Sequence, residues 1–262
     1  ANIGQVWDIT DIYNVTSKQN SGLSTISVKA TMGQIKNYIV VDNNDFYSPE
    51  KESDPSVSNQ DLKGTIFYDS QGQLKDVDYV IVSPAYLSGQ AERLANFHRN
   101  YSSLNVKVVT LEMLYKEFSS GKPDIGAIRN FVKYIYDNDS FVPGDRIKYV
   151  CLFGDASFDF KDRIQNNTNV VPIFHSLESF SLVSSFVSDD YFGLMGSNEG
   201  DMISGGGLDI AVGRILASNV EQAEQMVTKI IDYHDLKSYG RWRNNIVFIS
   251  DDIDKSSDSS LQ

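Results

Sequence analysis

The chain has 262 residues, a formal net charge of -12, 41% hydrophobic residues and 11% aromatic residues. This length allows one large buried core or two smaller ones, and the composition is that of a globular protein and not of a disordered one. The acidic balance argues against a nucleic-acid partner, because phosphate backbones require concentrated Lys and Arg. The sequence contains no run of about 18 apolar residues, so it predicts no membrane-spanning helix.

The first 75 residues predict a β-rich lead-in. They hold four short runs that alternate or are rich in β-branched residues: 5–15, 24–31, 36–42 and 64–69. Polar, turn-prone stretches separate these runs, which is typical of an antiparallel sheet or sandwich. We therefore predict one domain, or part of one, over residues 1–75.

From residue 76 onward, strands alternate with amphipathic helices. The expected strands are 79–83, 106–110, 147–154, 208–215 and 245–250. Helices are expected around 91–98, over 111–118, from Pro123 onward, and from Ser218 onward, where Ser218 and Glu221 have capping-box spacing. Right-handed crossovers place helices on both faces of a parallel sheet, so residues 76–262 predict an α/β domain of three layers.

Acidic and polar residues follow the predicted strands. Gly154 and Asp155 follow one strand, Arg214 lies near the end of the next, and Asp251 and Asp252 follow the last. Ligands of open parallel sheets bind beyond the carboxyl ends of the strands. A functional site is therefore expected at this edge, although turns favour Asp and Gly in any protein.

Cys151 is the only cysteine in the sequence. It lies inside a predicted apolar strand, where a thiol tends to keep its proton, while the thiolate is the form that attacks. Of the three histidines, His98 and His234 lie on or beside apolar helix stripes, and His175 has no nucleophile nearby in the sequence. We interpret Cys151 as a buried structural residue, and no Cys/His dyad is visible.

Metal ligands of the zinc type are absent from the sequence, because it lacks the Cys and His spacing that zinc sites use. Oxygen ligands remain, and they suit calcium or magnesium. The acidic candidates are Asp155, Asp189, Asp190, Asp201 and Asp209. Two alternatives therefore stay open beside a thiol enzyme: a metal-dependent hydrolase that uses an Asp cluster, and a non-catalytic surface-binding module.

Several segments together resemble the first half of the gingipain-type cysteine peptidase domain. In chain order they read "DYVIVSPAYLSGQAERLANFHRNYSSLNVKVVTLEML", "IGAIRNFVKYIY", "IKYVCLFGDASFD", "VSDDYFG", "LDIAVGRI" and "RWRNNIVFISDD". The likeness covers about residues 76–254. The β-rich lead-in that starts with "QVWDITDIYNV" further resembles the sortase branch of this family, which serves the type IX secretion system.

This resemblance implies a caspase/gingipain-like sheet, with a catalytic histidine and cysteine further along the parent chain than Gln262. It implies that Asp252, with Asp251 as the alternative, is the acid that orients this histidine. It also implies calcium near Asp155 and Asp209, and no other cofactor. On these grounds we expect the 262 residues alone to lack peptidase activity.

The implied parent is an exported protein on the outer-membrane surface of a Gram-negative bacterium. It would cleave the carboxy-terminal sorting signal of secreted cargo proteins and attach the cargo to surface lipopolysaccharide. Its expected partners are therefore the cargo, the lipopolysaccharide acceptor and other secretion-system proteins.

Overall fold

The computed structural model describes residues 3–44, 46–48, 50–51, 53, 56, 59–139, 146–178, 180–181, 184–202 and 206–248. Contacts divide the chain into two units, Ala1–Ser58 and Asn59–Gln262. Residues 59–75, assigned above to the lead-in, lie in the second unit. Within the described ranges, no helix combines the length and the hydropathy needed to cross a bilayer.

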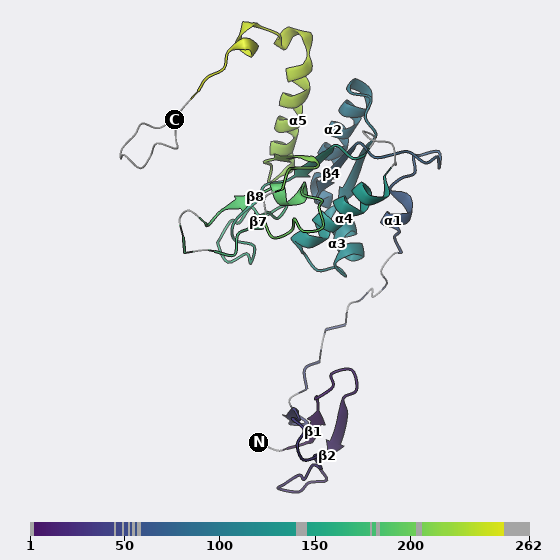
Figure 1. Cartoon of the computed structure of the whole chain (residues 1–262), viewed down its shortest axis with the longest axis vertical. Helices are drawn as coiled ribbons and strands as arrows, with labels where there is room; N and C mark the ends of the chain where they lie inside the picture. Colours follow the sequence, from purple (N-terminus) through teal and green to yellow (C-terminus); the bar gives the residue numbers. More distant parts are fainter. Residues whose placement is uncertain are drawn as a thin grey trace. The chain divides into compact units, whose positions relative to one another are not determined.

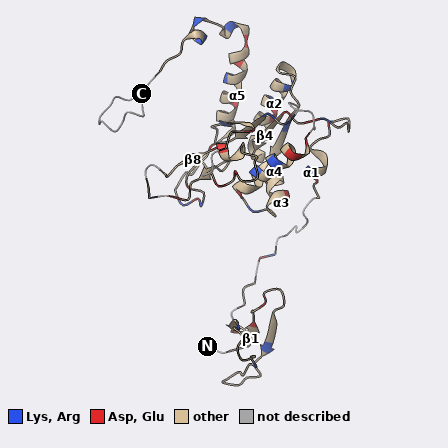
Figure 2. Ribbon diagram, viewed as in Figure 1, with Lys and Arg blue, Asp and Glu red and all other residues tan. Residues whose placement is uncertain are grey.

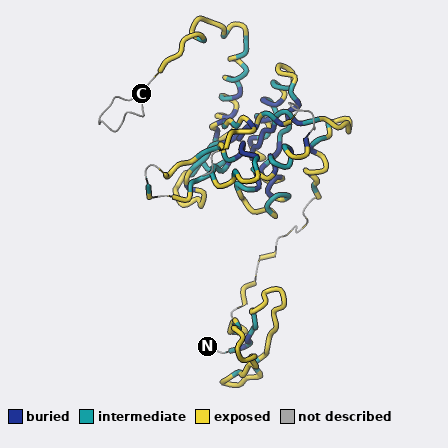
Figure 3. The backbone as a smooth tube through the Cα atoms, viewed as in Figure 1, coloured by how far each residue is buried: buried dark blue, intermediate teal, exposed yellow. Residues whose placement is uncertain are grey.

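The first unit is a three-stranded antiparallel sheet. Its strands are β1 (Gln5–Asp8), β2 (Thr16–Gln19) and β3 (Tyr38–Val41), in the order β2-β1-β3. The predicted strand over residues 24–31 is not formed, and most of this segment is exposed. Val6 is the one buried hydrophobic residue among those described in this unit. Most of the described residues of the unit are exposed (Figure 3).

The second unit is built on a four-stranded parallel sheet. Its strands lie in the order β5-β4-β6-β9, with all neighbours parallel. They span Tyr79–Ser83 (β4), Val106–Thr110 (β5), Tyr149–Phe153 (β6) and Ala211–Ile215 (β9). The first two match the predicted bounds, and the last two lie inside them.

Helices cover both faces of this sheet (Figure 1). Alternate residues of β4 show the division, because Val80 and Val82 pack with α3 and α4 while Ile81 packs with α2 and α5. The four helices are α2 (Ser88–Tyr101), α3 (Leu111–Phe118), α4 (Ile125–Asn138) and α5 (Val220–His234). The prediction of a three-layer parallel α/β sheet after a β-rich segment is confirmed.

Side chains before the helices fix where they begin. Asp124 accepts a hydrogen bond from the backbone N–H of Gly126 at 2.7 Å and caps α4. Asn219 caps α5 by accepting from Gln222 N–H at 3.0 Å. The capping residue is thus one position after the predicted Ser218, whose hydroxyl donates to the Gln222 side chain instead.

Short elements complete the connections. They are α1 (Leu62–Thr65), η1 (Ala85–Leu87), β7 (Phe174–His175), β8 (Val187–Ser188), η2 (Asp190–Phe192), η3 (Leu236–Ser238) and η4 (Arg241–Asn244). Strands β7 and β8 pair with each other in an antiparallel two-stranded sheet. This small sheet lies in the connection between β6 and β9.

Besides 24–31, two further predicted strands are wrong within the described residues. The run 64–69 overlaps α1, because Asp61 caps a short helix there and Glu117 of α3 accepts the backbone N–H groups of Leu62 and Lys63. The run 245–250 forms no strand over its described part, and Val247 and Phe248 are 79% and 88% exposed. β-Branched and aromatic residues favour a strand only where another strand pairs with them.

Candidate functional site at the carboxyl edge of the sheet

Arg214 organises the carboxyl edge of the parallel sheet. Its side chain is 8% exposed and forms a bidentate pair with Asp189, with nitrogen–oxygen distances of 2.7 and 2.8 Å. The same guanidinium donates to the carbonyl oxygens of Gly154 at 2.9 Å, Val171 at 2.7 Å and Pro172 at 3.2 Å. A planar, permanently charged fork suits this role, which an ammonium group could not reproduce.

The segment after β6 folds back onto the strand end. The backbone carbonyl of Asp155 accepts hydrogen bonds from the N–H groups of Val170 and Val171, at 3.1 and 2.9 Å. A Cβ on Gly154 would lie 2.6 Å from a methyl carbon of Val170 and 2.7 Å from one of Val171. Glycine is therefore required here by close approach, and the loop after β6 is held against the strand it leaves.

The Asp155 side chain takes part in this turn. One of its carboxylate oxygens accepts the N–H of Ala156 at 2.8 Å, and its own N–H donates to the carbonyl of Ala217 at 3.1 Å. Asp155 thus links the connections that follow β6 and β9. Its placement at this edge agrees with the position expected from the sequence.

Asp209 lies at the opposite end of the sheet. It precedes β9, and β6 and β9 run parallel with Phe153 beside Ile215. Asp155 and Asp209 are therefore separated by at least the span of a five-residue strand, about 13 Å. Two ligands of one calcium ion each lie within about 2.6 Å of it, so these two carboxylates do not share an ion.

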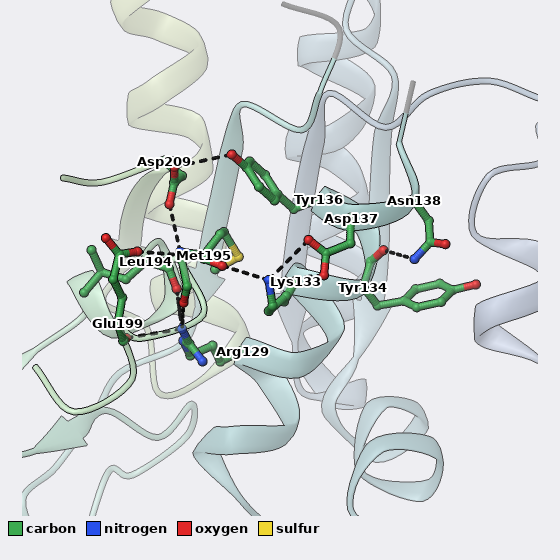
Figure 4. Close-up of polar contacts among 11 residues, drawn as sticks. Arg129, Lys133, Tyr134, Tyr136, Asp137, Asn138, Leu194, Met195, Glu199 and Asp209 are labelled. Atoms are coloured by element: carbon green, nitrogen blue, oxygen red, sulfur yellow. Dashed lines mark hydrogen bonds and ion pairs between the residues drawn. The ribbon is translucent and has the colours of Figure 1, made fainter. Parts of the chain in front are cut away.

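The carboxylate of Asp209 has protein donors instead. It accepts the N–H of Met195 at 2.9 Å and the hydroxyl of Tyr136 at 3.3 Å (Figure 4). Beside it, Arg129 and Lys133 of α4 donate to backbone carbonyl groups of the loop that precedes β9, at Leu194, Met195, Gly196 and Glu199. Positive side chains thus occupy the place where carbonyl oxygens converge.

The described residues contain no group of three or more His, Cys, Asp or Glu side chains placed to hold a metal ion. Asp189 is paired with Arg214, and Asp190 begins η2. The two acids expected to act in catalysis, Asp251 and Asp252, lie outside the described residues. The expected calcium site and the expected catalytic acid both stay predictions.

Cys151 lies in the middle of β6 and is 3% exposed. Burial raises the pKa of its thiol to about 12, an effect that a hydrogen bond with Tyr79 and the charge of Arg214 only partly offset. At neutral pH the thiolate fraction is negligible, so this thiol is poorly suited to attack a carbonyl. The interpretation of Cys151 as a buried structural residue agrees with this geometry.

The histidines do not form a dyad with Cys151. His98 packs edge-on against Tyr79, with ring centroids 5.5 Å apart, and its Nδ1 lies 3.3 Å from the Ser102 hydroxyl. His234 places its Nδ1 2.8 Å from the carbonyl oxygen of Ile230 in its own helix. Both imidazoles therefore have packing roles at the ends of α2 and α5.

The family model of peptidase family C25 matches residues 73–262. The chain belongs to peptidase family C25, the gingipain family. The match begins before β4 and includes every strand of the parallel sheet and helices α2 to α5. The resemblance inferred from the sequence motifs is thereby confirmed.

One solved structure of this C25 type is the crystal structure of dimeric latent PorU from Porphyromonas gingivalis. It is 32% identical to this chain, with a TM-score of 0.55 over 67% of this chain and 18% of that chain. The C25 chain thus spans less than a fifth of the length of that protein. No protein of curated function matches it.

Sequence reasoning missed the partners of the C25 chain's buried arginine. The sequence indicates Arg214 only as a residue near a strand end, and Asp189 only as one of several acids. An arginine inside an otherwise apolar strand is itself a signal, because a buried charge requires a partner. Arg129 carried a weaker signal, because it lies among the apolar positions of α4.

Proposed function

We propose that this chain is the amino-terminal part of the catalytic region of an exported cysteine endopeptidase and transpeptidase, the sortase of type IX secretion. The observation that carries the proposal is the match to peptidase family C25 over residues 73–262. The 32% identity to PorU supports the sortase branch of the family. The acidic net charge of -12 gives no basis for a nucleic-acid partner, and Lys and Arg are scattered in the view of Figure 2.

In the proposed reaction, the parent protein cleaves the carboxy-terminal sorting signal from secreted cargo. A cysteine thiolate attacks the scissile carbonyl carbon, the carbon–nitrogen bond breaks, and a histidine gives its proton to the departing amine. The resulting thioester is resolved by an amine of the lipopolysaccharide acceptor or by water. The cargo is then left on the outer-membrane surface or released.

The nucleophile of this reaction comes from another part of the parent. Cys151 is the only cysteine of the 262 residues, and burial holds it in the thiol form. We place Asp252, or Asp251 beside it, as the acid that orients the histidine of the parent. Calcium at Asp155 or at Asp209 would be structural. Because these two carboxylates do not share an ion, the remaining ligands of each site would come from other groups.

The test of the reaction uses the full-length parent. The parent is incubated with a cargo protein that ends in a sorting signal, together with lipopolysaccharide, and the products are identified by mass spectrometry. We expect the cargo to lose its carboxy-terminal sorting signal and to gain the mass of lipopolysaccharide. Thiol alkylation of the parent should abolish both changes. Cleavage that survives complete alkylation would exclude a cysteine mechanism.

A second assay uses residues 1–262 alone with the same cargo and a thiol-reactive peptide inhibitor. We expect neither cleavage nor labelling. Turnover that disappears in Cys151→Ala would show that Cys151 is a nucleophile and would overturn this assignment. Metal-dependent phosphatase activity lost in Asp155→Ala would favour a hydrolase of another class, for which the described residues offer no metal-binding cluster.

A further inference from the structure

A cavity of about 490 Å³ lies at the carboxyl edge of the sheet, on the face that α3 and α4 cover. This volume falls within the range of small-ligand pockets, roughly 300 to 1,000 Å³. Leu111 and Tyr115 of α3 form one wall, and Ile125 at the start of α4 forms a second. Val170, Pro172 and Ile173 form a third. The cavity is thus lined mainly by apolar side chains from three different segments.

Three polar side chains, Asp124, Asn169 and His175, also line this cavity. The Nε2 atom of His175 is buried and has no hydrogen-bond partner among the described residues. A buried imidazole nitrogen costs free energy unless a partner reaches it. The second polar group, Asp124, already accepts the Gly126 N–H with its carboxylate, and its charge disfavours a second carboxylate in the cavity.

The wall next to the strand ends is held in place by the groups described above. Arg214 binds the carbonyl groups of Val171 and Pro172, and His175 pairs with Val187 of β8. The cavity therefore lies beside the edge at which parallel sheets bind ligands, and its wall is bonded to the arginine that organises this edge. A preformed wall of this kind lowers the cost of ordering on binding.

We propose that this cavity binds one large aromatic side chain of a peptide, with a preference for tyrosine, whose hydroxyl pairs with His175 Nε2 once the imidazole turns to present this atom to the cavity. An aromatic ring fits within an apolar volume of this size with room for neighbouring peptide atoms, and a buried tyrosine hydroxyl needs a hydrogen-bond partner. The negative charge of Asp124 excludes aspartate and glutamate side chains. The inference rests on the proposed function for the choice of a peptide as the ligand class.

The test measures binding and needs no catalysis. Four tetrapeptides with capped termini differ at one position, which is Tyr, Phe, Ala or Glu. Each is titrated into the 262-residue chain, and NMR follows its binding. We expect the Tyr peptide to bind most tightly and the Phe peptide next, with the Ala and Glu peptides at least about tenfold weaker than Tyr. Equal binding of all four, or no binding at millimolar concentration, overturns the proposal.

Two variants locate the binding. Ile173→Trp places a larger side chain on the cavity wall and should weaken binding of the Tyr and Phe peptides about tenfold, while the control Leu177→Trp, at a side chain that is 98% exposed, should leave binding unchanged. His175→Phe keeps a ring and removes the nitrogen, so the preference for Tyr over Phe should disappear.

Unchanged affinity in folded Ile173→Trp, or a Tyr preference that persists in His175→Phe, contradicts the assignment. Circular dichroism checks the fold of each variant. If Ile173→Trp does not fold, the His175→Phe comparison decides alone. Because the titration involves no nucleophile, a failed peptidase assay and a failed binding assay are separate results.

Discussion

The two faces of the parallel sheet are covered by helices of similar length that are buried to different extents. α4 has 14 residues and buries five: Ala127, Ile128, Phe131, Val132 and Ile135. α5 has 15 residues and buries only Ala223 and Val227. A cavity of about 660 Å³ lies on the α2/α5 face, with Tyr79, His98 and Cys151 among its lining residues.

The edge strand explains part of this difference. β9 is the last strand of the sheet, and its residues Ala211 and Gly213 are exposed, whereas β4 in the interior exposes little. A helix that covers an edge strand has less apolar surface to bury than one that covers the middle of a sheet. We therefore expect the α3/α4 face to provide most of the stability, while the α2/α5 face holds the buried thiol of Cys151 and the half-buried imidazole of His98.

Truncation of one large side chain on each face tests this comparison most strongly. Phe131→Ala removes a fully buried ring and should lower the free energy of unfolding by about 3–5 kcal/mol. Val227→Ala on α5 should cost about 2 kcal/mol, partly because valine is the smaller side chain. The matched comparison is therefore Val132→Ala on α4, which removes the same atoms from an equally buried valine and should cost more. Urea denaturation followed by circular dichroism measures all three, and a larger loss in Val227→Ala than in Val132→Ala would reverse the assignment.

Arg214 provides the second test, at the carboxyl edge of the parallel sheet. Arg214→Ala should lower the free energy of unfolding by about 2–4 kcal/mol, because it leaves the Asp189 carboxylate and three carbonyl groups without their shared donor. Arg214→Lys should recover only part of this loss.

A matched control for Arg214 is an exposed ion pair. The Lys237 side chain is 81% exposed in its pair with Asp235, so Lys237→Ala should leave the denaturation midpoint unchanged. Equal midpoint shifts in Arg214→Ala and Lys237→Ala would show that the buried arginine does not organise the edge.

How much of this fold was predictable depends on the range of the interactions involved. Three elements were predicted with their observed bounds: the strands 79–83 and 106–110 and the helix 111–118. Each is a short apolar run or stripe with a turn-forming or capping residue at its end. The run 24–31 was mispredicted, as were the run 64–69 and the described part, 245–248, of the run 245–250. In the run 64–69, Glu117 of a distant helix decides the structure, and no strand pairs with the run 245–248.

The candidate site shows the same limit. The position of Asp155 after β6 follows from the predicted strand alone, and the burial of Cys151 follows from the apolar residues of that strand. The separation of Asp155 from Asp209 was not predicted, because the expected strand 208–215 includes Asp209, whereas β9 begins at Ala211 and leaves Asp209 before the strand. Likewise, the pairing of Arg214 with Asp189 joins residues 25 apart through a connection whose course no local pattern predicts.

The third test concerns the thiol on the less buried face. With the pKa of Cys151 near 12, against an ordinary value of 9.0, the native chain should react with iodoacetamide at pH 8 roughly a thousandfold more slowly than the unfolded chain. Mass spectrometry of the alkylated protein, with and without urea, measures the two rates. Rapid labelling of the native chain would mean that the cavity beside Cys151 admits solvent to the sulfur.

The smallest expected effect comes from His98 on the same face. Burial, and then the charge of neighbouring His234, hold the pKa of His98 below its usual 6.5. The unfolded chain then takes up a proton more readily than the folded one, so stability is retained above pH 6.5 and is lost as the pH falls below it. Because His98 is only about half buried, solvent screening limits the loss to under about 1 kcal/mol.

Urea denaturation at pH 7.5 and at pH 5 measures this dependence in the wild-type chain and in His98→Phe. The variant keeps an aromatic ring against Tyr79 and removes the titrating nitrogen atoms, so its stability should fall less between the two pH values. An identical fall in both proteins would assign the pH dependence to other groups. It would also remove His98 from the titrating groups that distinguish the α2/α5 face from the α3/α4 face.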